Sequence, residues 1–190
     1  MPTKTSRPRR SVALALAALT ALRPSTLEAP DWSVAFHPDG NRIAIGTYRK
    51  VVVYALADGE KVAEWPVGTE AIRALAFHAS GKVLAIGSGA PGASGSVILL
   101  DTTTGQATQT LKIHDDTIEG LAFSGDVLLS ASDDEKVVLT DTKTGTRIGV
   151  LSEHIGRCLS VAVPVRTTDG AGGAIFATGG ADKMVKIWDA

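Results

Sequence analysis

The sequence predicts an all-β chain built from repeats of one small antiparallel sheet. Three observations support this prediction. After residue 30 the apolar segments are short, and turns rich in Gly, Asp and Pro separate them. The apolar period of a helix does not appear in that part of the chain. The same strand-and-turn signal also returns at intervals of 40 to 46 residues.

The repeat can be aligned on four positions, Phe36, Phe77, Phe123 and Val163. Their spacings are 41, 46 and 40 residues, and we attribute the longest spacing to an inserted loop at 87–95. An apolar strand leads into each aligned position. One small sheet cannot bury both of its faces, so we expect successive sheets to stack side by side.

A second signal recurs in step with the first. Gly59, Gly105 and Gly145 each lie in a tight turn after a strand, and one more strand follows each turn. This register divides the chain into an N-terminal extension and linker at 1–30 and a repeat region at 31–190. The first three sheets should have four strands, whereas the fourth has three and lacks its outer strand. The expected sheets are 31–67, 72–112, 118–151 and 154–190.

The last sheet carries the most informative motif. Residues 174–189 read Ala-Ile-Phe-Ala-Thr-Gly-Gly-Ala-Asp-Lys-Met-Val-Lys-Ile-Trp-Asp, which indicates two short strands around a tight turn. His154 lies twenty residues before this stretch. The pattern resembles the WD-repeat β-propeller family, whose blades end in a Trp-Asp pair. The resemblance implies a propeller segment of three full blades and a partial fourth, arranged as an open arc.

The resemblance also implies a hydrogen-bonded set inside a blade, made of a loop His, a strand Ser or Thr, a turn Asp and a strand Trp. The third blade has three of the four groups, with Thr140 at the Trp position. The first two blades have Ile45 and Ile86 at the Ser or Thr position, which indicates apolar replacement, because buried polar groups need partners. The expected structural residues are His154, Thr178, Asp182 and Trp188 in the fourth blade, and His114, Ser130 and Asp134 in the third.

A hydroxyl, an imidazole and a carboxylate also suggest a catalytic triad. We reject that interpretation for Thr178 and Ser130. Each hydroxyl lies in the middle of an expected strand, without a strand-to-helix elbow and without a helix N-terminus to form an oxyanion hole. The sequence therefore predicts no enzyme.

Two further motifs are interpreted as turns. Residues 87–92 match G-x-G-x-x-G, but neither a helix nor the required acidic residue follows, so we expect a flexible turn that is at most a ligand contact. The acidic runs at 115–116 and 133–135 lack the alternating spacing and distal Glu of a calcium loop. We expect no metal and no cofactor.

Charge and cysteine content exclude other classes. Five of the 19 basic residues lie in 1–27, which leaves 14 basic against 20 acidic residues in the remainder, a net charge of −6. A region with this net charge binds nucleic acid poorly, because phosphate contacts require clustered Lys and Arg. Cys158 is the single cysteine, so neither an internal disulfide nor a Cys-rich zinc site can form.

The first 22 residues resemble a secretory signal peptide. A basic segment with Arg9 and Arg10 precedes eleven almost wholly apolar residues at 12–22. As a helix these residues would be roughly 16 Å long, too short for a bilayer core of ~30 Å. An Arg-rich organelle transit peptide and an Ala/Leu helix docked on the fold are alternatives. We favour export, as a periplasmic or secreted protein, over a cytoplasmic location, and expect no membrane span.

The expected function is a non-catalytic protein–protein interaction scaffold. The resemblance implies that protein partners bind the face made of the connections between blades and the turns between the second and third strands. The alternative is an exported propeller that binds a small molecule or forms part of a larger extracytoplasmic enzyme. It requires charged side chains that converge at the central channel, and we find no such cluster in the sequence. The expected partner-binding residues are Arg49, Lys50, Glu70, Asp115, Asp116, Glu135, Glu153 and Lys183.

We do not expect this chain to close a ring by itself. A seven-bladed ring at ~43 residues per blade needs about 300 residues. Residues 24–30 contain two prolines and residues 12–22 suit a helix, so neither segment is a good outer strand for the fourth blade. The apolar strand at 184–188 should therefore be an exposed edge, which predicts self-association or missing blades.

Overall fold

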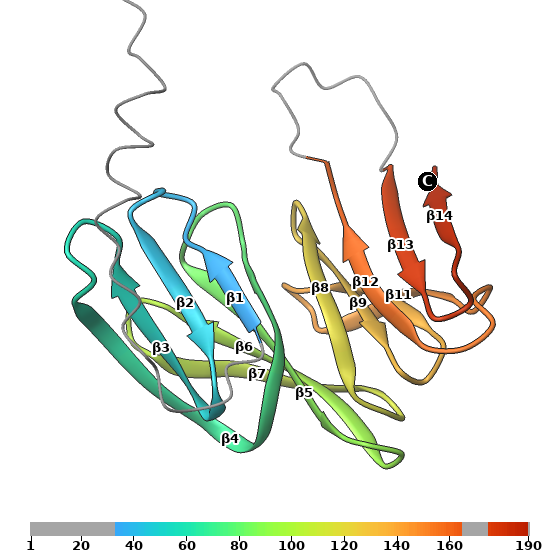
Figure 1. Ribbon diagram of the computed structural model, residues 1–190, viewed down its shortest axis with the longest axis horizontal. Helices are drawn as coiled ribbons and strands as arrows, with labels where there is room; N and C mark the ends of the chain where they lie inside the picture. Colours follow the sequence, from blue (N-terminus) through green and yellow to red (C-terminus); the bar gives the residue numbers. More distant parts are fainter. Residues whose placement is uncertain (1–32, 165–174, 190) are drawn as a thin grey trace, which may run out of the picture.

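A computed structural model describes residues 33–164 and 175–189, and within these ranges every regular element is an antiparallel β-strand (Figure 1). The strands form a row of small sheets that follow one another along the chain. None of the described residues forms a helix long and apolar enough to cross a membrane.

The first two sheets share one strand. The predicted separate strands at 61–66 and 72–77 are one continuous strand, because its first part pairs with the sheet before it and its second part with the sheet after it. This strand, β4, is thus the outer strand of the first sheet and the inner strand of the second (Figure 1). The strands are β1 (Ser33–Phe36), β2 (Arg42–Gly46), β3 (Tyr48–Ala55), β4 (Lys61–Phe77), β5 (Val83–Ala90), β6 (Ser94–Asp101) and β7 (Gln106–His114).

The third and fourth sheets follow in the same order, from an inner strand outwards. The third has four strands, whereas the described part of the fourth has three, with β14 at its edge. Figure 1 places β14 at the end of the row away from β1 to β3. The strands are β8 (Ile118–Ser124), β9 (Val127–Ser132), β10 (Val137–Asp141), β11 (Thr146–Leu151), β12 (Cys158–Ala162), β13 (Phe176–Gly180) and β14 (Val185–Trp188).

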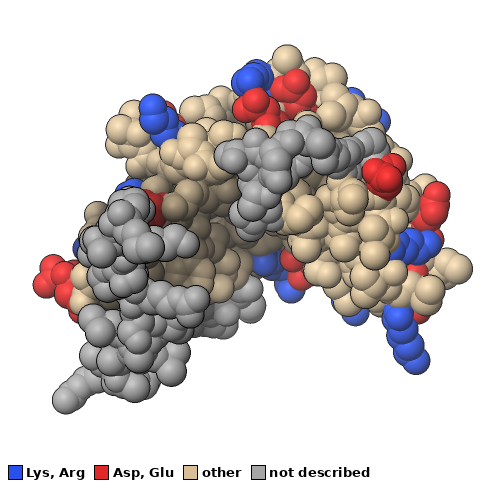
Figure 2. Space-filling view, turned by 90° about the horizontal axis from the view of Figure 1, so that it is seen from above, with Lys and Arg blue, Asp and Glu red and all other residues tan. Residues whose placement is uncertain are grey.

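Apolar side chains fill the space between successive sheets. Leu84 and Ile86 of β5 pack with Val51 and Val53 of β3, and these four side chains are at most 2% exposed. A second cluster joins the other face of the second sheet to the third, and a smaller one joins the third sheet to the fourth. The predicted fold class, an all-β propeller segment that forms an open arc, is confirmed. Seen from above in Figure 2, the body is curved and open on one side.

The predicted flexible loop at 87–95 is largely wrong. β5 continues to Ala90 and pairs there with Ser94, so only three residues form the turn. The glycines serve close packing rather than flexibility. A Cβ on Gly87 would lie 2.8 Å from Ile118 Cγ2 of the next sheet, and one on Gly89 would lie 2.4 Å from the Ser94 carbonyl oxygen. Glycine is therefore required where backbone and neighbouring atoms approach this closely.

Candidate functional site

The fourth sheet holds a buried polar set. His154 Nδ1 lies 2.9 Å from Asp182 Oδ2, and Nε2 lies 2.8 Å from Thr178 Oγ1. The Trp188 indole N–H donates to the same Thr178 hydroxyl over 2.9 Å. Because the Asp182 carboxylate can only accept, His154 donates to it from Nδ1. Nε2 of the neutral ring then accepts the proton of the Thr178 hydroxyl, which itself accepts from Trp188.

The Asp182 carboxylate closes this set. Burial raises its pKa, but bonds from His154 and from the backbone N–H groups of Met184 and Ile155 outweigh burial, so the pKa lies below its ordinary value. One carboxylate thus holds the loop before β12 and the turn before β14 together.

The third sheet has the same arrangement with one member replaced. His114 Nδ1 lies 2.9 Å from Asp134 Oδ2, and Nε2 lies 2.8 Å from Ser130 Oγ. The residue at the Trp position is Thr140, whose buried hydroxyl has no hydrogen-bond partner among the described residues. The Ser130 hydroxyl also lies 3.3 Å from the Val138 carbonyl oxygen.

Both hydroxyls are inaccessible to a substrate. Ser130 is fully buried and Thr178 is 1% exposed. A nucleophile must reach the reacting atom, so this geometry supports a structural role for both sets.

The connections between sheets are tied to turns at one end of the molecule. Asp116 Oδ1 accepts from the Gly92 N–H over 2.8 Å, which joins the connection before β8 to the β5–β6 turn. The backbone N–H of Asp115 donates to Asp134 over 3.0 Å, which joins the same connection to the β9–β10 turn. We call this end the turn face. It consists of the turn at 47–50, which includes the first residues of β3, the turns at 91–93, 133–136 and 181–184, the middle of β4 at 68–71, and the connections at 115–117 and 152–157.

All eight predicted partner-binding residues lie on the turn face. Two of them are half-buried and have partners within the chain. Lys50 Nζ lies 3.1 Å from Glu64 Oε1. The Asp116 carboxylate accepts from the backbone N–H of Gly92, and this hydrogen bond holds the pKa of Asp116 below its ordinary value. The six exposed members are Arg49, Glu70, Asp115, Glu135, Glu153 and Lys183.

Three of these residues adopt an unusual backbone conformation. Arg49, Glu135 and Lys183 have φ angles of 72°, 71° and 66°. This left-handed region is costly for residues with a side chain and free of strain for glycine. The corresponding β5–β6 turn has Gly92, with φ 67°. Three long charged side chains therefore occupy turn positions where glycine would have less backbone strain.

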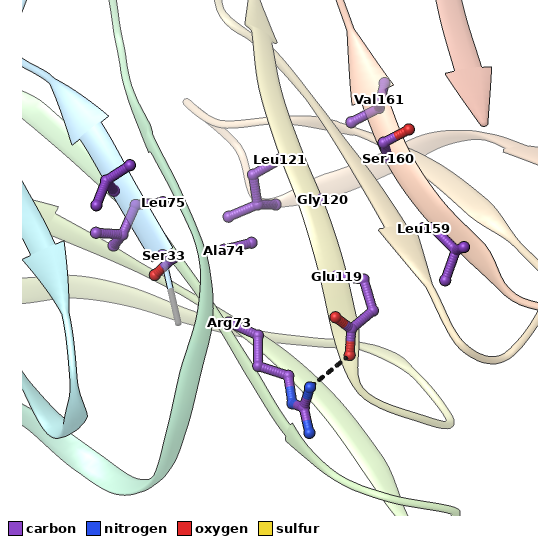
Figure 3. A pocket seen from close by; sticks show the side chains of 11 residues that line it. Ser33, Arg73, Ala74, Leu75, Glu119, Gly120, Leu121, Leu159, Ser160 and Val161 are labelled. Carbon is purple, nitrogen blue, oxygen red and sulfur yellow. Dashed lines mark ion pairs between the residues drawn. The ribbon is translucent and has the colours of Figure 1, made fainter. Parts of the chain in front are cut away.

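A pocket lies on the inner side of the arc, where β1, β4, β8 and β12 meet (Figure 3). Its volume is about 250 Å³. Three of these strands have a β-bulge at the same position, where two residues on the inner strand oppose one on its neighbour. The extra residues are Arg73, Glu119 and Leu159, and all three line the pocket. A bulge re-aims side chains in this way.

The sequence analysis missed the charged pair in this pocket. Arg73 Nη1 lies 3.3 Å from Glu119 Oε1, as the dashed line in Figure 3 shows. Burial raises the pKa of Glu119; Arg73 opposes this shift and Asp133 adds to it. Arg73 and Glu119 each stand four residues before an aligned Phe, so the alignment of repeats contained the signal. The two charges have opposite sign and neutralise each other. The described residues contain no group of three His, Cys, Asp or Glu side chains that could hold a metal ion.

Two family models match the chain. One, described as "Anaphase-promoting complex subunit 4 WD40 domain", matches residues 34–124. The other, described as "WD domain, G-beta repeat", matches residues 145–189. Together they cover most of the strands described above.

Curated relatives include pre-mRNA-processing factor 19 from Bos taurus, which is 27% identical over 154 residues. These residues are 80% of this chain and 29% of the relative, so the chain spans less than a third of that protein. Telomerase protein component 1 from Rattus norvegicus is 31% identical over 134 residues, which are 68% of this chain and 5% of the relative.

Solved structures show the same fold. U3-55K superposes with a TM-score of 0.73 at 20% identity, over 86% of this chain and 50% of that one. The RRP9 WD40 repeats give the same TM-score and identity, over 86% and 49%. The computationally designed Ika4 protein has a TM-score of 0.69 at 20% identity, over 87% of this chain and 94% of that one.

These relatives contradict the predicted location. The prediction of export is wrong, because the relatives are named for pre-mRNA processing and for telomerase, which are nuclear processes and not functions of periplasmic or secreted proteins. The segment at 1–22 that motivated the prediction lies outside the described residues. The alternative of an exported enzyme or exported small-molecule binder loses its basis with it.

Proposed function

The chain belongs to the WD-repeat family, and we propose that it is a non-catalytic scaffold that binds protein partners on its turn face. The observation that carries this proposal is the left-handed conformation of Arg49, Glu135 and Lys183. Residues held in sparsely populated backbone regions cluster at functional sites. These three side chains are exposed, so burial in a core does not account for them.

The charges of the turn face favour a protein partner with a basic segment. Five of the eight predicted partner-binding residues are acidic and three are basic. Glu135 follows Asp134 in the β9–β10 turn and is exposed. Asp115 is also exposed, and its carboxylate lies 2.9 Å from Lys136 Nζ. Complementary charge steers such a partner and sets its orientation. The same acidic excess disfavours direct binding of nucleic acid through its phosphates.

The names of the relatives suggest the setting. Pre-mRNA-processing factor 19 and telomerase protein component 1 are named for processes that act on RNA or depend on it. We propose that the present chain likewise belongs to an RNA-processing assembly, in which it binds other proteins. The polar sets around His114 and His154 then hold the connections and turns of the third and fourth sheets in place.

Glycine substitution tests the proposal without disturbing the turns. The triple variant Arg49→Gly, Glu135→Gly, Lys183→Gly removes three charged side chains and leaves a residue suited to positive φ. We expect the thermal midpoint to stay within a few degrees, because relief of strain offsets the greater chain entropy of unfolded glycine.

Affinity purification with quantitative mass spectrometry provides the binding measurement. The control variant Glu60→Gln, Lys82→Gln removes exposed charges from turns at the opposite end of the sheets. We expect at least one protein that copurifies with the wild type to be lost with the triple glycine variant and retained with the control. Retention of every copurifying protein by the triple glycine variant would contradict the proposal.

A further inference from the structure

The two ends of the arc leave two apolar sheet faces uncovered. At one end, Val34 and Phe36 of β1 are 60% and 66% exposed, and they lie on the same side of the sheet as their partners Ile45 and Ile43 on β2. We call this the leading face.

At the other end, Val185 and Ile187 of β14 are 73% and 76% exposed. They share a side with their β13 partners, Gly179 and Ala177. We call this the trailing face. Neighbouring apolar side chains that are exposed together in this way mark an interaction surface.

The interior of the chain shows what each face is built to contact. Phe77 and Phe123 are the repeat equivalents of Phe36, and both pack against the core between their own sheet and the preceding one. His37 of the preceding sheet lies edge-on to Phe77, with ring centroids 4.9 Å apart. His78 makes the same contact with Phe123 at 5.3 Å.

The trailing face has an equally clear equivalent. By the strand register, Val137 and Leu139 of β10 correspond to Val185 and Ile187 of β14. Val137 is 1% exposed because it packs with Cys158 of the next sheet, and Leu139 lies against the same cluster. Each sheet therefore uses its trailing side to cover the leading side of the next.

We propose that two copies of the chain close one eight-bladed ring, in which the trailing face of each copy packs on the leading face of the other. Four sheets from each copy give eight blades, within the range of four to eight found in propellers. The two new contacts are related by a twofold axis, and they cover both open faces of the described sheets in each copy, so the ring closes at two copies. This inference does not depend on the proposed partner binding.

The area lies at the lower limit for a specific interface. With strands ~4.8 Å apart and ~3.3 Å per residue, a three-stranded face of five residues per strand measures roughly 240 Å². The closed pair covers two leading and two trailing faces, which makes about 1,000 Å² in total. That is the area a specific interface needs to reach. The contact is also the continuation of one that the chain already makes between its own sheets.

Light scattering of the full chain after size-exclusion chromatography tests the ring. We expect a single species of twice the 19.6 kDa chain mass, without trimers or larger species. Ile187→Lys on the trailing face and Phe36→Lys on the leading face should each raise the dissociation constant of the dimer at least tenfold. Both positions are exposed in the single chain, so the strand content measured by circular dichroism should not change.

The matched control is Ile148→Lys. This side chain is 55% exposed on the outer strand β11, away from both open faces, and its variant should remain a dimer. A wild-type monomer at tens of micromolar, an open-ended series of oligomers, or a dimer that survives both face variants would each overturn the proposal. Loss of strand content in a face variant, with loss of dimer, would also count against it, because the positions would then serve the single chain.

Discussion

Thr140 offers a direct test of how the polar sets work, because its side chain stands where the fourth sheet has Trp188. Thr140 is fully buried, and its hydroxyl has no hydrogen-bond partner among the described residues. It pairs across the sheet with Leu128, which belongs to the apolar core between the second and third sheets. Replacement by valine keeps the shape of the side chain and exchanges the unpaired hydroxyl for a methyl group.

The sign and size of the effect follow from the cost of an unsatisfied group. A buried polar group without a partner costs about 1–3 kcal/mol, so Thr140→Val should stabilise the fold by about 1 kcal/mol. The same substitution at Thr178 should have the opposite sign. That hydroxyl bonds to both His154 and Trp188. Its loss leaves the buried His154 Nε2 and the part-buried Trp188 indole N–H without this partner, at a cost of about 1–3 kcal/mol.

Thermal unfolding at one fixed protein concentration measures both variants, since association makes the midpoint depend on concentration. For a domain of this size, 1 kcal/mol shifts the midpoint by about 2–4 °C. We therefore expect the midpoint of Thr140→Val to rise by that amount and the midpoint of Thr178→Val to fall by at least as much. A fall for both variants would refute the reasoning, because it would show that the Thr140 hydroxyl contributes a favourable interaction.

Three further predictions concern single side chains. Burial raises the pKa of Asp134, but hydrogen bonds from His114 and from backbone N–H groups outweigh burial and hold this pKa below its ordinary value. The ionised Asp134 therefore stabilises the fold above about pH 4, and this stabilisation is lost as the pH falls through the folded-state pKa. In that pH window the urea midpoint of the Asp134→Asn variant should depend less on pH than that of the wild type. Burial raises the pKa of Glu119 although Arg73 opposes the shift, so the fold disfavours the ionised carboxylate. Glu119→Gln should therefore increase the free energy of unfolding at pH 7 and leave it unchanged at a pH below the ordinary pKa of Glu. A decrease at pH 7 would show that the ion pair with Arg73 outweighs the cost of burial. Cys158 is 1% exposed and burial raises its pKa to about 11, so a thiol reagent at pH 8 should label it only at the rate of unfolding, and fast labelling of the native protein would contradict its placement.

The order and spacing of the strands could be read from the chain because the signals are local. A turn needs particular residues at adjacent positions, and a half-buried strand needs alternation within a few residues. The aligned positions Phe36, Phe77 and Phe123 therefore located three inner strands without knowledge of their neighbours. The residues of both polar sets were named because the chain resembles the WD-repeat family, whose blades carry a loop His, a strand hydroxyl and a turn Asp.

The export prediction failed for a different reason. Its evidence was the composition of 12–22, which is independent of the fold that follows. A short apolar segment after basic residues is compatible with several fates, and the relatives contradict the one that was favoured.

The sequence by itself determined the class of the fold, the number of repeats and the residues that occupy equivalent positions in each repeat. Tertiary structure decided the rest: that β4 serves two sheets, that Gly87 and Gly89 are packing positions, and that Arg73 and Glu119 meet in a pocket. A bulge exists only relative to the strand it pairs with, and a close approach only relative to the next sheet. Both depend on partners distant in the chain, whereas the pattern within one strand records only which residues are apolar and where the strand ends.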